Sequence, residues 1–158
     1  MSASANASAP LDDTTLELRR EFDASPAAVF DAWMTREAWG AWIGPEGMQC
    51  EVPTLEARVG GRYEITMRLG SGQVIPVSGI FKVIERPQRL VFSWGWNGDP
   101  SRQSLITLEF HARGTRTELV LRQEGLGTIA NRNDHAKGWG STLNKLERHL
   151  ATQSSASI

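Results

Sequence analysis

The feature that most constrains the fold is a series of short segments in which apolar and polar residues alternate, separated by turns of a few residues. Turns are predicted at 70–72, at Asn97-Gly98-Asp99-Pro100 and at 113–114. The positions that share one side of each segment are Tyr63, Ile65, Met67 and Leu69; Val77, Gly79, Phe81 and Val83; Leu90, Phe92, Trp94 and Trp96; Ile106, Leu108 and Phe110; and Thr117, Leu119 and Leu121. A period of two is typical of half-buried strands. Short turns favour an antiparallel meander, because parallel strands need long crossovers.

The N-terminal part of the chain predicts one strand followed by two short helices. The strand contains Leu16, Leu18 and Phe22. Ser25 can cap a first helix, with Pro26 in its first turn. Thr35 can cap a second helix, which Gly44-Pro45 ends. Residues 48–57 are a further, weaker strand.

The C-terminal part predicts one long amphipathic helix. Asn133 or Asp134 can cap it, and its length is about 17 residues. Its apolar positions are Trp139, Leu143, Leu146 and Leu150. Spacings of four, three and four residues place them in one stripe, which indicates that the helix covers one face of the sheet.

These elements predict an α+β fold, with a curved antiparallel sheet of about seven strands wrapped on the long C-terminal helix. The predicted domain covers residues 14–151. Residues 1–13 and 152–158 are small and polar. They are predicted to be disordered tails, because they cannot bury enough apolar surface to offset the entropy of ordering.

Composition narrows the class of protein. Lys and Arg number 17 against 18 Asp and Glu, so the net charge is -1, which indicates neither nucleic acid nor an anionic membrane as partner. No apolar run is long enough to span a membrane, and the N-terminus does not resemble a secretory signal. The single cysteine, Cys50, excludes an internal disulfide and fits a reducing compartment. We therefore expect a cytoplasmic protein.

Several short motifs resemble the START-like, or SRPBCC, superfamily, and within it the branch named after the C-terminal domain of the activator of Hsp90 ATPase. The matching stretches are Phe22-x-x-Ser25-Pro26-x-x-Val29-Phe30, Trp42-Ile43-Gly44-Pro45, Gly60-Gly61-Arg62-Tyr63, Pro87-x-Arg89-Leu90-Val91-Phe92-x-Trp94, and Gly138-Trp139 leading into Leu143. They span nearly all of residues 16–150 and are specific only in combination.

The resemblance implies a helix-grip fold with a cavity between the concave sheet face and the C-terminal helix. Superfamily members include lipid and hormone carriers and polyketide cyclases, so it implies no single reaction. Two departures matter. Full Hsp90 activators carry a further N-terminal domain, for which this sequence has no room, so direct co-chaperone activity is not expected. Many relatives have histidine near the end of the last strand, where this sequence reads Leu121-Arg122-Gln123-Glu124.

The candidate ligand-binding residues are the inward-facing aromatic and aliphatic side chains together with a few polar anchors. A cavity lined in this way suits a small hydrophobic molecule such as a lipid, a polyketide or another aromatic compound. The alternative is that the rings simply fill the core. The predicted set is Tyr63, Ile65, Met67, Phe81, Phe92, Trp94, Trp96, Ile106, Leu108, Gln123, His135, Trp139 and Leu143, with Asn97 as a further polar anchor.

Residues able to carry out catalysis or hold a metal are few. His135 is the best candidate for a general base, and the alternative is a histidine near the helix start that bonds a nearby carbonyl. Cys50 has no partner at metal-ligand or redox spacing and is interpreted as a strand cysteine. We therefore predict no metal, no cofactor and no firm catalytic residue.

Three functions remain open at this point. The first is binding of a small hydrophobic ligand, as a monomer or homodimer. The second is a cavity enzyme of the cyclase or hydrolase type, which requires a titratable group such as His135, Glu51 or Glu64 to face the ligand. The third is a chaperone-modulating interaction domain, which would need an exposed apolar patch on the outer sheet face, where the alternation instead places charged residues.

Overall fold

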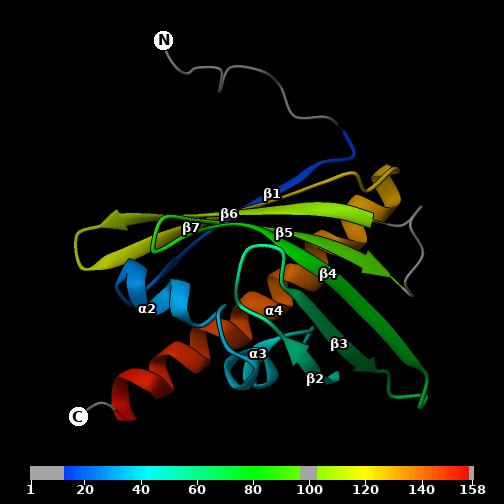
Figure 1. Cartoon of the computed structure of the whole chain (residues 1–158), viewed down its shortest axis with the longest axis horizontal. Coiled ribbons are helices and arrows are strands. Elements are labelled where there is room, and N and C mark those ends of the chain that lie inside the picture. Colours follow the sequence, from blue (N-terminus) through cyan, green and yellow to red (C-terminus); the bar gives the residue numbers. More distant parts are fainter. Residues whose placement is uncertain (1–12, 97–102, 157–158) are drawn as a thin grey trace.

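The main element of the computed structural model, which describes residues 13–96 and 103–156 and side chains as far as Thr152, is a curved seven-stranded antiparallel sheet (Figure 1). The strands are β1 (Leu16–Phe22), β2 (Gln49–Leu55), β3 (Arg62–Arg68), β4 (Val74–Glu85), β5 (Arg89–Trp96), β6 (Gln103–Arg113) and β7 (Arg116–Glu124). The turn predicted at 97–100, with Asn97, lies outside the described residues, as does the predicted tail up to residue 12.

The strand order is β1-β7-β6-β5-β4-β3-β2. Strands β2 to β7 therefore form the predicted meander, in which each strand pairs with the next along the chain. Strand β1 closes the far edge by pairing with β7, from Leu16 opposite Gln123 to Phe22 opposite Thr117. The prediction of an antiparallel α+β fold is confirmed.

One predicted strand face is wrong at its end. The pairing of β4 with β5 shifts between Phe81 and Val83, which is the signature of a β-bulge. Beyond the shift Ile84 pairs with Leu90 and packs against the core. Val83 is therefore turned to the opposite face, because successive side chains alternate. A bulge inserts one residue, and the sequence alternation alone does not reveal it.

Two short helices follow β1 as predicted. Helix α2 covers Pro26–Asp31 and helix α3 covers Arg36–Trp42. The Ser25 hydroxyl accepts a hydrogen bond from the Ala28 backbone N–H at 3.2 Å, and the Thr35 hydroxyl accepts one from Ala38 at 3.1 Å. Both predicted caps are thereby confirmed.

The C-terminal helix α4 covers Ile129–Ala156 and is longer than predicted. The Thr128 hydroxyl accepts a hydrogen bond from the Asn131 backbone N–H at 3.0 Å, so the cap lies upstream of Asn133 and Asp134. Those two residues lie inside the helix, which also runs through Ala156 into the range 152–158 predicted as a tail. A cap-like residue inside a helix has no further signal in the sequence to mark it as interior.

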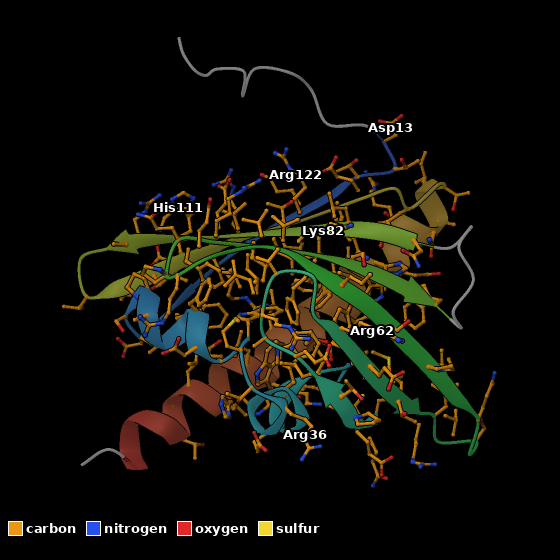
Figure 2. The ribbon with its side chains drawn as sticks, viewed as in Figure 1. Asp13, Arg36, Arg62, Lys82, His111 and Arg122 are labelled. Atoms are coloured by element: carbon orange, nitrogen blue, oxygen red, sulfur yellow. The ribbon has the colours of Figure 1, made fainter. Side chains whose placement is uncertain are left out.

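Helix α4 lies against the concave face of the sheet, on the same side as α2 and α3 (Figure 1). The predicted stripe Trp139, Leu143, Leu146 and Leu150 is buried in the core. His111 and Arg122 point from the sheet to the side away from α4 (Figure 2). The helix therefore covers one face and leaves charged side chains on the other.

Candidate ligand-binding site

A cavity of about 420 Å³ lies between the first half of α4, the loop after α3, and the ends of β3, β4 and β5. Most of its wall is apolar and its polar residues come mainly from α4. The lining residues are Ile43, Gly44, Pro45, Met48, Met67, Gln73, Ile75, Trp94, Trp96, Asn131, Asp134, His135, Gly138, Trp139 and Thr142.

Five of the predicted site residues meet in this wall. Trp94 and Trp96 come from one face of β5, and Met67 comes from β3. His135 and Trp139 are four residues apart on α4, which places them on one helix face. Alternation in the strands and helical spacing in α4 are thus sufficient to bring these five together once α4 crosses the sheet.

The other apolar residues of the predicted site do not line the cavity. They are buried in the hydrophobic core instead: Tyr63, Ile65, Phe81, Phe92, Ile106 and Leu108 from the strands, and Leu143 from α4. Trp33 and Trp39 fill the space in front of them, with ring centroids 5.0 Å apart for Trp39–Tyr63 and 6.2 Å apart for Trp33–Phe92. For these residues the interpretation as filled core is the better one.

Gln123 holds α4 to the sheet. Its side chain is fully buried at the end of β7. The amide oxygen accepts a hydrogen bond from Trp139 Nε1 at 2.9 Å, and the amide nitrogen donates to Ser104 Oγ at 2.7 Å. Gln123 is absent from the cavity wall and its amide is already engaged, so it is a structural bridge rather than the predicted ligand anchor.

His135 lies at the cavity wall with both ring nitrogens engaged. Trp96 Nε1 donates a hydrogen bond to Nε2 at 3.0 Å, and Nδ1 lies 2.9 Å from the Asn131 carbonyl oxygen. An indole N–H can only donate, so Nε2 must carry the lone pair, and Nδ1–H donates to the carbonyl. This arrangement describes a neutral histidine that ties β5 to α4, with no free nitrogen to act as a general base.

The loop after α3 forms a wall that the sequence analysis missed. The backbone N–H of Glu46 donates to Ser141 Oγ at 2.7 Å, and Lys145 Nζ donates to the Ile43 carbonyl oxygen at 3.1 Å. The Glu46 carboxylate accepts from Arg148 Nη2 at 2.8 Å, and hydrogen bonds from Arg148 and Asn144 lower its pKa. Hydrogen bonds with four side chains of α4 therefore hold this loop beside the cavity.

The other lining residues that were missed had weaker signals. Ile75 lies two residues before Val77 on β4 and pairs with Met67 on β3. The period of two along β4 could therefore have predicted it. Gln73 follows the turn predicted at 70–72, and Thr142 on α4 is small and polar. No property of these last two residues distinguishes them in sequence from ordinary surface positions.

Cys50 and Gly44 make a close contact beside the loop. A Cβ at Gly44 would clash with Cys50 Sγ, and the glycine has φ of 85°, so no other residue fits without strain. Burial raises the pKa of the Cys50 thiol, and the nearby positive charge of Lys145 only partly opposes this shift. The thiol is therefore no activated nucleophile.

Trp94, one of the lining residues, has an indole N–H that is itself buried and has no acceptor. The indole N–H groups of Trp39 and Trp42 bond the carbonyls of Trp33 and Ala32 at 2.8 and 3.0 Å. Among the described residues only Trp33 and Trp94 have a buried indole N–H with no acceptor. Leaving such a donor unpaired costs about 1–3 kcal/mol. Of the two, Trp94 belongs to the cavity.

Metal-ligand clusters and membrane-spanning helices are both lacking in the described ranges 13–96 and 103–156. No group of three or more His, Cys, Asp or Glu side chains there is placed to hold a metal ion. Within the same ranges no helix is long and apolar enough to span a membrane.

The family model described as "Activator of Hsp90 ATPase homolog 1-like protein" matches residues 23–151. The chain belongs to this family. The matched range lies inside the predicted domain 14–151, and the suspected membership of the SRPBCC superfamily, with its helix-grip fold, is confirmed. No curated protein matches the chain.

Solved structures agree with this family assignment. The AHSA1 protein from Silicibacter pomeroyi is 31% identical with a TM-score of 0.75, over 88% of this chain and 99% of that one. A protein from Chromobacterium violaceum is 26% identical with a TM-score of 0.78, over 85% and 95%. A protein from Arthrobacter aurescens, at 20% identity and a TM-score of 0.79 over 90% of each chain, supports the fold alone.

Proposed function

We propose that this member of the AHSA1-like family binds a small apolar molecule in the cavity beside α4. The observation that carries the proposal is a cavity of about 420 Å³ walled by three indole rings and two methionines while the rest of the concave face is filled. Pockets of roughly 300–1,000 Å³ with mostly apolar walls and few polar groups are typical of sites for small ligands.

The contacts of the wall support a ligand with a flat ring. The ring centroids of Trp94 and Trp139 are 5.2 Å apart, and those of Trp94 and Trp96 are 5.9 Å apart. These rings bring a large apolar contact area from both β5 and α4. Met48 and Met67 can adapt to ligands of different outline, because their unbranched side chains have several rotatable bonds.

The enzymatic alternative has less support. It required a titratable group free to act on the ligand, and His135 was its best candidate. Both nitrogens of that ring are bonded, one to Trp96 and one to the Asn131 carbonyl. Glu51 and Glu64 do not line the cavity. We therefore place binding ahead of catalysis.

Chaperone modulation is the third candidate. The family description names an activator of Hsp90 ATPase. The sheet face that such a partner would use carries charged pairs such as Arg122–Glu17 and Arg113–Glu118, with no large apolar patch among the described residues. A cytoplasmic location and a monomeric or homodimeric state accompany the proposal of ligand binding.

The test is a fluorescence titration with N-phenyl-1-naphthylamine, a neutral aromatic probe whose emission rises in apolar surroundings. We expect saturable binding of one probe per chain. A Gly138→Leu variant should lose most of this signal, because Gly138 lines the cavity and a Cβ there already meets Pro45 Cγ at 3.8 Å.

Gly140→Leu is the matched control. It makes the same change on the same helix, at a glycine that has no atoms within 4 Å of an added Cβ and that does not line the cavity. It should bind the probe like the unmodified protein. A probe that does not saturate, or equal binding by the two variants, would contradict the proposal.

A further inference from the structure

The cavity wall is unbalanced in charge. Of its described lining residues, Asp134 is the one with a formally charged side chain. It lies in the second turn of α4 and is exposed, so it occupies the part of the wall that meets solvent. The polar residues near it in the chain, Asn131 and His135, are uncharged.

His135 supplies no positive charge to balance Asp134. Its Nε2 accepts the hydrogen bond from Trp96 Nε1, and a protonated ring could not accept it. Lys145 lies outside the wall and donates to the Ile43 carbonyl oxygen at 3.1 Å. Arg132 and Lys137 on α4 also do not belong to the lining.

Among the described residues that line the cavity, those at the start of α4 are the ones that would favour an anion. The partial positive charge of a helix start acts mainly within the first turn. That turn contributes only Asn131 to the wall, and the Asn131 backbone N–H is already bonded by the Thr128 hydroxyl at 3.0 Å. A full negative charge on Asp134, one turn further on, opposes this weaker attraction.

An anionic ligand is therefore at a disadvantage in this cavity. Its carboxylate or phosphate would leave water for a mostly apolar wall, and burying an unpaired charge is costly. Near the mouth it would meet the Asp134 carboxylate. A ligand with an amine would instead form an ion pair there. An uncharged ligand would meet neither the cost of burying a charge nor the repulsion from Asp134.

Building on the proposed function, we propose that the cavity selects neutral and basic aromatic molecules over acids, with Asp134 as the specificity-determining residue. The ammonium group of a basic ligand pairs with the Asp134 carboxylate, and the ring lies among Trp94, Trp96 and Trp139. Free fatty acids and phosphorylated lipids are the classes that the wall excludes.

The experiment uses three molecules that share one naphthalene ring: 2-naphthylmethylamine, 2-naphthalenemethanol and 2-naphthoic acid. Their Kd values are measured by calorimetry with the full chain at neutral pH. We expect the amine to bind at least as tightly as the alcohol, and the acid to bind about tenfold more weakly than the amine. Added salt should narrow this gap, because exposed charge pairs are screened.

The decisive variant is Asp134→Asn, which removes the charge with little change in shape. The amine should lose roughly two- to fivefold in affinity, the acid should gain, and the alcohol should be unchanged. Glu147→Gln, thirteen residues along the same helix and outside the cavity, should change none of the three values. Equal melting temperatures would show that both variants are folded.

The outcomes separate the two proposals. If the alcohol binds and the amine and acid have equal Kd values, the charge selection is overturned while ligand binding stands. The same holds if the alcohol binds and Asp134→Asn leaves the ratio of the amine and acid Kd values unchanged. Failure of all three molecules to bind overturns the charge selection together with the proposed function.

Discussion

The two halves of the concave sheet face are lined by the same kinds of side chain, yet one is solid and the other hollow. In the solid half the rings of Phe92, Phe81 and Tyr63 are fully buried and lie against Trp39. In the hollow half Trp94 and Trp96 face the cavity of about 420 Å³. Phe92, Trp94 and Trp96 are alternate residues of one strand, β5, so strand pattern does not separate the halves.

The difference lies in what covers each half. Helix α3 brings Trp39 and Trp42 over the solid half, and the turn between α2 and α3 brings Trp33; each of the three is fully buried. The hollow half is covered by α4 and by the loop at 43–48, which presents Pro45 to Gly138, a residue with no side chain to fill the space. Short helices far away in sequence therefore decide which part of the concave face is left hollow.

The largest expected effect separates the two halves by stability. Phe92→Ala in the solid half should lower the free energy of unfolding by about 3–5 kcal/mol, because a well-packed site leaves a cavity. Met67→Ala in the hollow half should cost about 2 kcal/mol or less, since Met67 already lacks partner atoms on its cavity side. Urea denaturation measures both, and equal losses would remove the distinction.

The next effect concerns the joint between α4 and the sheet. Gln123→Leu should cost about 2 kcal/mol, because the buried Trp139 N–H loses its acceptor at 2.9 Å. Adding Trp139→Phe to this variant removes the unpaired donor and should recover part of the loss, which a double-mutant cycle of unfolding energies would show. Strict additivity of the two changes would mean that the bond contributes nothing.

The smallest effect is a pH dependence on the far side of the solid half. Burial lowers the pKa of His149, which lies on α4 beside α2 and α3. The unfolded chain then binds the proton more readily than the folded state, so stability falls as pH decreases through the window below the ordinary value of 6.5. The loss should be a few tenths of a kcal/mol, since His149 is partly solvated.

His149→Gln tests this assignment, because glutamine does not titrate. Chemical denaturation at about pH 7 and about pH 5 should show a smaller difference for the variant than for the unmodified protein. The stabilising contribution of the carboxylates is lost over a lower pH range, and it affects both proteins alike. Asp31, whose pKa Arg86 lowers, is one example. An unchanged difference between the two pH values would place the effect elsewhere.

Much of the fold could be predicted because the signals were local. Alternation in the strands, the Ser25 and Thr35 caps and the stripe from Trp139 to Leu150 each depend on residues close in the chain. The wrong predictions concern places where a local sequence pattern is compatible with two structures. The bulge before Val83 reverses a face without changing the pattern, and Thr128 rather than Asn133 or Asp134 caps α4.

The site was predicted only in part for a related reason. Met67, Trp94, Trp96, His135 and Trp139 were expected in the cavity and line it. Most of the others, including Phe92 and Leu143, were expected there and are in the filled core. Inward-facing rings share one sequence signature whether they face a ligand or each other, so alternation could not divide them.

By itself, then, the sequence determined which side chains face inward, because the period of a strand or helix is a property of its own backbone. Only the tertiary structure decided which of those side chains are left with empty space before them. That outcome depends on how far α2, α3 and the loop at 43–48 reach across the sheet, and on which polar groups, such as Gln123 and His135, are already bonded across it.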